Sequence, residues 1–184
     1  MRLSLVLLLG LAASPAAAWS PCDELWFTRN LIYDRAGYCF SSTLGRAVFD
    51  NSDCTGTEVR LDARAAADVA TIEGYEQEMS CAIDSGRRAL AVADLAARRA
   101  LIDLPVPSAY ASACYGWRGA PITLHAGRSD SAPVTGTIRT GDDLVWTFDG
   151  ADGWAFVLSQ QLPGQMGWYR EPVYSPEDCT ASAG

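Results

Sequence analysis

The side chains in this sequence best suited to binding are the aromatic residues of its second half. Aromatic rings bury a large contact area at little entropic cost, so they dominate many binding surfaces. The alternative for Trp154 and Trp168 is that their rings complete a small hydrophobic core. We predict a ligand-binding surface whose candidate residues are Trp117, Trp146, Trp154, Trp168 and Tyr169.

Residues that could perform catalysis are few. His125 is the only histidine, and its place in an alternating segment predicts an exposed side chain on the face opposite Ile122 and Leu124. A catalytic triad needs a nucleophile within reach of the base and an acid that orients it, and no phosphate-binding or dinucleotide motif is found. Glu76 and Glu78 lie two positions apart on a predicted helix, so they do not share a face. We therefore expect no enzyme, although the 22 acidic residues leave open a carboxylate pair that cleaves a sugar bond.

The N-terminus has the three parts of a secretory signal peptide, which we predict over residues 1–18. Arg2 provides the positive charge, residues 3–11 the apolar segment and residues 16–18 the small residues before cleavage. The apolar segment is too short to span a membrane, and no cysteine directly follows the cleavage site. We expect a periplasmic or secreted protein that begins at Trp19 and has no membrane anchor after cleavage.

All six cysteines follow this site, and an even number in an exported chain indicates disulfide bonds. Cys114 and Cys179 flank the second half, so we expect them to pair. Among the other four we prefer Cys39–Cys54 with Cys22–Cys81, because a helix of about 22 Å would separate Cys22 from Cys39. With no Cys-x-x-Cys and one histidine, we expect neither a metal site nor a cofactor.

The negative net charge of the chain excludes some classes of binding partner. The chain has a formal charge of −8, and without Arg2 the 13 basic and 22 acidic residues leave −9. Such a protein does not attract nucleic acid or anionic lipid surfaces. In this acidic context, Arg87-Arg88 and Arg98-Arg99 are expected to lie on solvated faces.

The first half is predicted to be helical. Ser20 is a candidate N-cap, Pro21 fits the first helical position and Gly37 is a natural left-handed stop. Arg29 and Asn30 are polar residues beside the apolar stripe, so we expect hydrogen bonds to the returning loop near residues 38–40, with a ligand site as the alternative. Further helices are predicted over residues 42–50, 62–79 and 87–104, with inward-facing residues that include Val69, Ile72 and Met79.

Residues 28–40, TRNLIYDRAGYCF, resemble the motif of the YARHG extracellular bacterial domain. Asp34 and Ala36 depart from this motif, so the motif's histidine is missing and no role can be carried over to it. The resemblance covers about residues 25–49 and implies a protein outside the cytoplasm without established catalytic chemistry. The matching residues are Arg29, Asn30, Ile32, Tyr33, Arg35, Gly37 and Phe40.

The second half alternates with period two, which predicts short strands separated by turns. Gly141-Asp142, Gly153-Trp154-Ala155-Phe156-Val157 and Gly167-Trp168 follow the order found in bacterial Src-homology-3-like barrels, which this region resembles. The resemblance implies binding of a cell-wall peptide or a protein segment. The predicted strands are residues 122–126, 134–138, 144–148, 153–158 and 166–170.

Together these patterns predict an α+β protein in which a disulfide-linked helical domain precedes a five-stranded β-barrel. We expect a non-enzymatic binding protein of the bacterial envelope that recognises a cell-wall or protein ligand through the barrel. The alternatives are an inhibitor or structural partner of another exported protein, and a weak glycoside hydrolase. The predicted parts are a helical domain (19–104), a linker (105–113), a barrel (114–179) and a tail (180–184).

Overall fold

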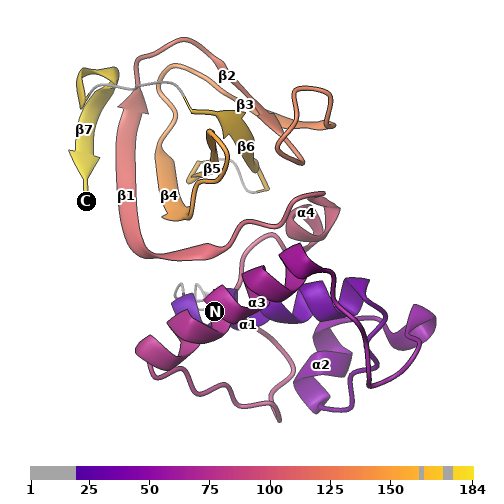
Figure 1. The fold of residues 1–184 in the computed structure, drawn as a ribbon. Coiled ribbons are helices and arrows are strands. Elements are labelled where there is room, and N and C mark those ends of the chain that lie inside the picture. Colours follow the sequence, from indigo (N-terminus) through magenta and orange to yellow (C-terminus); the bar gives the residue numbers. More distant parts are fainter. Residues whose placement is uncertain (1–19, 162–163, 172–175) are drawn as a thin grey trace, which may run out of the picture.

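The computed structural model describes residues 20–161, 164–171 and 176–184. The predicted signal peptide, residues 1–18, and Trp19 lie outside the described residues. Helices and strands segregate along the chain, and Figure 1 shows helices α1 to α3 together in one half, the sheet in the other and α4 between them. The predicted α+β class is confirmed.

Helix α1 (Pro21–Arg35) begins as the sequence predicts. The Ser20 hydroxyl accepts a hydrogen bond from the Asp23 amide at 3.3 Å, and Pro21 occupies the first turn. Gly37 has a φ of +87°, and a Cβ there would lie 2.6 Å from the Thr55 hydroxyl oxygen. The chain can therefore turn back beside residue 55 only because position 37 is glycine.

The next two helix predictions are also confirmed. The Ser42 side chain caps α2 (Thr43–Val48), a short 3-10 turn η1 (Asn51–Asp53) follows, and the Asp62 side chain caps α3 (Ala63–Glu78). Val69 and Ile72 of α3 are buried as expected. Met79 is 39% exposed, so its predicted inward orientation is wrong, because α3 ends one residue earlier.

The predicted helix over residues 87–104 is largely wrong. Only α4 (Leu95–Ala100) forms, and Asp94 before it has a left-handed φ of +56°. The preceding segment is held by Asp23, whose carboxylate accepts hydrogen bonds from the Arg87 guanidinium and from the Ala91 amide at 2.6 Å. These contacts hold the segment in an irregular path, despite its helix-forming alanine and arginine residues.

Seven strands form one antiparallel sheet among the described residues, in the order β3-β2-β6-β5-β4-β1-β7. All five predicted strands are present, but the predicted five-stranded barrel is wrong, because the sheet has two further strands and is not closed. The strands are β1 (Pro107–Trp117), β2 (Ile122–His125), β3 (Val134–Ile138), β4 (Leu144–Phe148), β5 (Trp154–Ser159), β6 (Met166–Arg170) and β7 (Cys179–Ala183).

The two missed strands correct the predicted linker and tail. Residues 107–113, assigned to a linker, are most of β1, and residues 180–183, assigned to a tail, belong to β7. Both strands are rich in alanine and serine and lack clear apolar alternation. Their pairing comes from the tertiary fold: β1 lies between β4 and β7 and pairs with both.

The sheet is buried on both faces at its centre. Along β5, Trp154 and Phe156 belong to one apolar cluster, while Ala155 and Val157 belong to another. The first cluster also takes in Leu101, which follows α4. The segment that includes α4 therefore packs against one face of the sheet.

Three disulfide bonds follow the preferred pairing. Cys22–Cys81 joins the start of α1 to the chain just beyond α3, Cys39–Cys54 closes the loop around α2, and Cys114–Cys179 joins β1 to β7. This prediction is confirmed. In the part of the chain that the structure describes, no helix is long and apolar enough to cross a membrane.

Candidate functional site

The five predicted aromatic residues do not form one surface. Trp117 and Tyr169 belong to the cluster on one face of the sheet, whereas Trp154 and Trp168 belong to the cluster on the other. These four side chains are only 2–4% exposed, so they contribute to the core, which was the alternative for Trp154 and Trp168. Trp146 is half-buried, and its indole nitrogen donates to the Tyr169 hydroxyl at 2.8 Å.

His125 is half-buried, so the expectation of an exposed side chain is wrong. Its Nδ1 lies 3.0 Å from the Ala132 carbonyl oxygen, and its ring meets Trp154 edge-on at 6.1 Å between centroids. The loop after β2 folds back over the ring. His125 borders a cavity of about 490 Å³ together with Trp117 and Tyr169. None of these contacts joins it to a nucleophile.

The YARHG-like motif residues make structural contacts. Arg29 does not bind the returning loop as expected but pairs with Glu76 of α3, with Nε and a carboxylate oxygen 3.0 Å apart. Asn30 donates to the Trp26 carbonyl at 2.7 Å within α1. The predicted partners are wrong, because α3 packs along α1 and supplies the nearer acid.

The remaining motif residues also stabilise the fold. The Tyr33 ring packs against the Tyr38 ring at 6.0 Å between centroids. The Arg35 guanidinium donates to the carbonyl of Ile102 at 3.2 Å and also to those of residues 99 and 101. Arg35 thus binds the end of α1 to the segment that enters the sheet.

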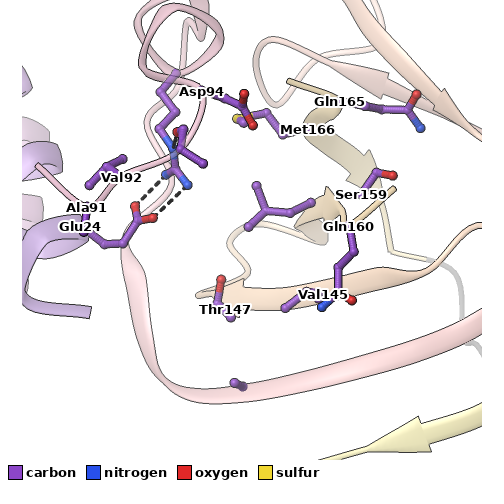
Figure 2. A pocket seen from close by; sticks show the side chains of 14 residues that line it. Glu24, Ala91, Val92, Asp94, Val145, Thr147, Ser159, Gln160, Gln165 and Met166 are labelled. Carbon is purple, nitrogen blue, oxygen red and sulfur yellow. Dashed lines mark hydrogen bonds and ion pairs between the residues drawn. The ribbon is translucent and has the colours of Figure 1, made fainter. Parts of the chain in front are cut away.

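A larger cavity, of about 660 Å³, lies between the helical half and the sheet. Three separate parts of the chain line it: the start of α1, residues 91–98 with part of α4, and strands β1, β4, β5 and β6 with the residues beside them. Figure 2 shows Glu24 on one side of the space and Val145 and Thr147 of β4 on another. Most of its wall is apolar, including Val92, Val145, Leu158 and Met166.

A buried ion pair forms part of this wall. The Glu24 carboxylate and the Arg98 guanidinium meet twice, at 2.8 Å and 3.0 Å, and both side chains are at most 5% exposed. Arg98 also donates to the Ala93 carbonyl at 3.0 Å, and its guanidinium lies 5.4 Å from the centre of the Phe148 ring. The expected solvated position of Arg98 is wrong, because Glu24 compensates its charge in the interior.

Arg87 was also expected on a solvated face, but its guanidinium pairs with the buried Asp23 carboxylate. Arg88 and Arg99 are exposed as predicted, although the Arg99 guanidinium also donates to the Val48 carbonyl.

Burial raises the pKa of Glu24 to about 7, although Arg98 opposes this shift and Asp23 adds to it. Burial likewise lowers the pKa of Arg98, against the attraction of Glu24 and Asp94. Both shifts have the same cause, because removing either charge from water costs more than the pairing returns. The pair is therefore held in place by the surrounding fold.

Two other polar side chains line the cavity without a hydrogen bond to the element that carries them. The Thr147 hydroxyl is buried and makes no hydrogen bond there. Asp94 precedes α4 at its N-cap, yet its side chain does not cap the helix. Figure 2 shows the Asp94 carboxylate beside Met166, at the edge of the space opposite Val145. The cavity thus offers hydrogen-bonding groups that the protein does not use.

Sequence patterns alone did not predict this site. Asp23 and Glu24 are also what a helix N-terminus favours, so their burial was not foreseen. The feature that could have predicted buried ion pairs is the Asp23-Glu24 pair beside Cys22, since the chain also has the arginine pairs Arg87-Arg88 and Arg98-Arg99. Nothing in the strands marked one end of β4 and β5 as a cavity wall.

Two known families match the chain, and their matches meet at the end of α3. Residues 80–184 match the family described as Domain of unknown function (DUF4453). This chain belongs to the DUF4453 family. Residues 3–77 match the YARHG domain, so the first resemblance is confirmed and extends beyond the predicted 25–49. No curated protein and no solved structure matches the chain.

The DUF4453 match takes in α4 and the irregular segment as well as the sheet. Its first residue, 80, lies well before the predicted barrel start at 114. The cavity is therefore bounded mainly by the DUF4453 part, with Glu24 as the contribution of the YARHG part.

Proposed function

We propose that this DUF4453 protein is an exported, non-enzymatic binding protein of the bacterial envelope that holds a small, largely apolar ligand in the cavity beside Glu24 and Arg98. The observation that carries the proposal is this cavity of about 660 Å³, whose surface is mostly apolar although seven of its fourteen lining residues have polar or charged side chains. Ligand sites in proteins are typically concave spaces of about 300–1,000 Å³ with a mostly apolar surface. The proposed binding site therefore lies at the junction of the two halves and not at the aromatic residues that the sequence predicted.

Export is supported by two independent features. The YARHG domain is of an extracellular type, and three disulfide bonds fit an oxidising compartment. We propose the periplasm or the extracellular space as the location. A ligand there would come from the cell wall, from another exported protein or from the surrounding medium.

Binding without catalysis is favoured by the state of the polar groups. The Glu24 carboxylate is already held by Arg98, through a hydrogen bond to Oε1 and an ion-pair contact at Oε2. A general acid or base must instead reach the proton that it transfers. Among the described residues, no group of three or more histidine, cysteine or acidic side chains could hold a metal ion.

The neutral fluorescent probe N-phenylnaphthylamine tests the proposal, because its emission rises in apolar surroundings. We expect saturable binding to the intact, oxidised protein and its loss in Val145→Phe, which fills the cavity from β4. Val134→Phe is the matched control, since Val134 is 62% exposed on β3 and does not line the cavity.

Thermal unfolding would verify that both variants fold. Equal probe binding by Val145→Phe and Val134→Phe, or no saturable binding by the parent protein, would overturn the proposal.

One observation favours a second function. Glu24 and Asp94 line the same cavity, burial raises the pKa of Glu24 to about 7, and glycoside hydrolysis uses a pair of carboxyl groups of which the general acid has a raised pKa. Release of nitrophenol from aryl glycosides, abolished separately by Glu24→Gln and Asp94→Asn, would establish this function. Because we propose a binding protein, we expect the parent protein to release no more nitrophenol than the Glu24→Gln and Asp94→Asn variants.

A further inference from the structure

The charges around the main cavity are unbalanced, and this suggests which ligand it takes. Its lining contains three charged side chains, the carboxylates of Glu24 and Asp94 and the guanidinium of Arg98. Glu24 binds Arg98 through both oxygens, so these two charges compensate each other. Asp94 also attracts Arg98, but with two carboxylates and one guanidinium the lining keeps an excess of one negative charge.

Several features separate Asp94 from an ordinary surface acid. Its side chain does not cap α4, although it stands where an aspartate commonly caps a helix, and it attracts the Arg98 guanidinium that Glu24 already binds. Its backbone is in the left-handed region, at φ +56°. Figure 2 shows the carboxylate directed away from α4 and beside Met166, at the edge of the cavity.

We propose that the ligand is a small cationic amphiphile, whose apolar body fills the cavity and whose amine binds the Asp94 carboxylate. This inference rests on the proposed function, because it names the class of ligand for the same cavity. An ammonium group supplies the donors that Asp94 lacks, and the neutral side chains of Ser159, Gln160 and Gln165 complete that rim. An anionic head would be repelled by Asp94 and would have to compete with Glu24 for Arg98.

Three ligands with one apolar chain test this choice: octylammonium, octanol and octanoate, each displacing N-phenylnaphthylamine from the oxidised protein at pH 7.5. We expect octylammonium to bind about fivefold more tightly than octanol, and octanoate to bind most weakly. Asp94→Asn should reduce the preference for octylammonium over octanol to less than about twofold. Asp53→Asn is the matched control, because Asp53 is exposed and does not line the cavity.

The outcomes separate this inference from the proposed function. Displacement by all three ligands with equal affinity, or a preference for octylammonium that survives Asp94→Asn, would overturn the cationic ligand while leaving the binding cavity intact. Failure of all three ligands and of the probe would overturn both. Loss of the preference in Asp53→Asn as well would show that net charge, and not Asp94, attracts the amine.

Discussion

The two halves of the molecule fill their interiors differently. The helical half buries the charged side chains of Asp23 and Glu24 and has two disulfide bonds, one of which joins residues 59 positions apart. The sheet half buries aromatic rings on both faces of β5 and β6 and has one disulfide, between two neighbouring strands. Both halves also bury apolar clusters, so the difference is that the helical half adds buried charged pairs to its apolar core.

This difference suggests why the cavity lies where it does. Aromatic side chains pack closely within the sheet, and Phe156 and Trp168 meet edge-on at 5.3 Å between centroids. The Glu24–Arg98 pair instead fixes the positions of α1 and α4 without filling the space beside it. We infer that the charged pair maintains an open junction that an apolar contact would close.

The largest expected effect tests the sheet half. Trp168→Ala should lower the free energy of unfolding by about 4–5 kcal/mol, because the ring is 2% exposed and its nitrogen donates to the Asp103 carbonyl at 2.8 Å. Urea denaturation measures the loss, and Val134→Ala on the exposed part of β3 is the control, with a loss below about 0.5 kcal/mol. A loss below about 2 kcal/mol for Trp168→Ala would contradict an aromatic core.

The covalent links of the helical half come next. Replacing Cys22 and Cys81 by serine should cost about 4 kcal/mol, and replacing Cys39 and Cys54 about 3 kcal/mol, because the loops that they close differ in length, with separations of 59 and 15 residues. Urea unfolding of the two double variants measures the difference. A larger loss for the shorter loop would show that loop closure does not govern their contributions.

Breaking the charged pair tests the interior of the helical half. Arg98→Met should cost about 3–4 kcal/mol at pH 7.5, because it leaves the Glu24 carboxylate buried without its cation. The double variant Arg98→Met/Glu24→Leu should recover most of this loss, since it leaves no buried charge. If the double variant is no more stable than Arg98→Met, the loss is one of packing and not of charge.

The pH dependence of stability has the smallest expected effect. The Glu24 pKa is about 7 in the folded protein and near 4.5 when unfolded, so the folded state binds the extra proton between these values. The contribution of Glu24 to stability is therefore greatest below about pH 4.5 and falls as the pH rises towards 7. From pH 5 to 7.5 the parent should lose about 2 kcal/mol relative to Glu24→Gln, which does not titrate there. A constant difference between the two proteins would contradict the raised pKa.

Much of the local structure was predictable because its causes are local. The caps Ser20, Ser42 and Asp62 mark their helices, and alternating residues mark five strands. The predicted helix over residues 87–104 was wrong because the carboxylate of Asp23, far away in the sequence, accepts hydrogen bonds from Arg87 and from the Ala91 amide. Strands β1 and β7 were missed because pairing with neighbours, and not their own composition, makes them strands.

The sequence by itself determined the α+β class, the caps, the five alternating strands and the disulfide pairing. These follow from short-range sterics, apolar periodicity and the reach of a helix. Only the tertiary structure decided that the aromatic rings are core, that Arg98 is buried and that a cavity separates the halves. Glu24 and Arg98 are 74 positions apart, and no local pattern specifies which distant charge will compensate a buried one.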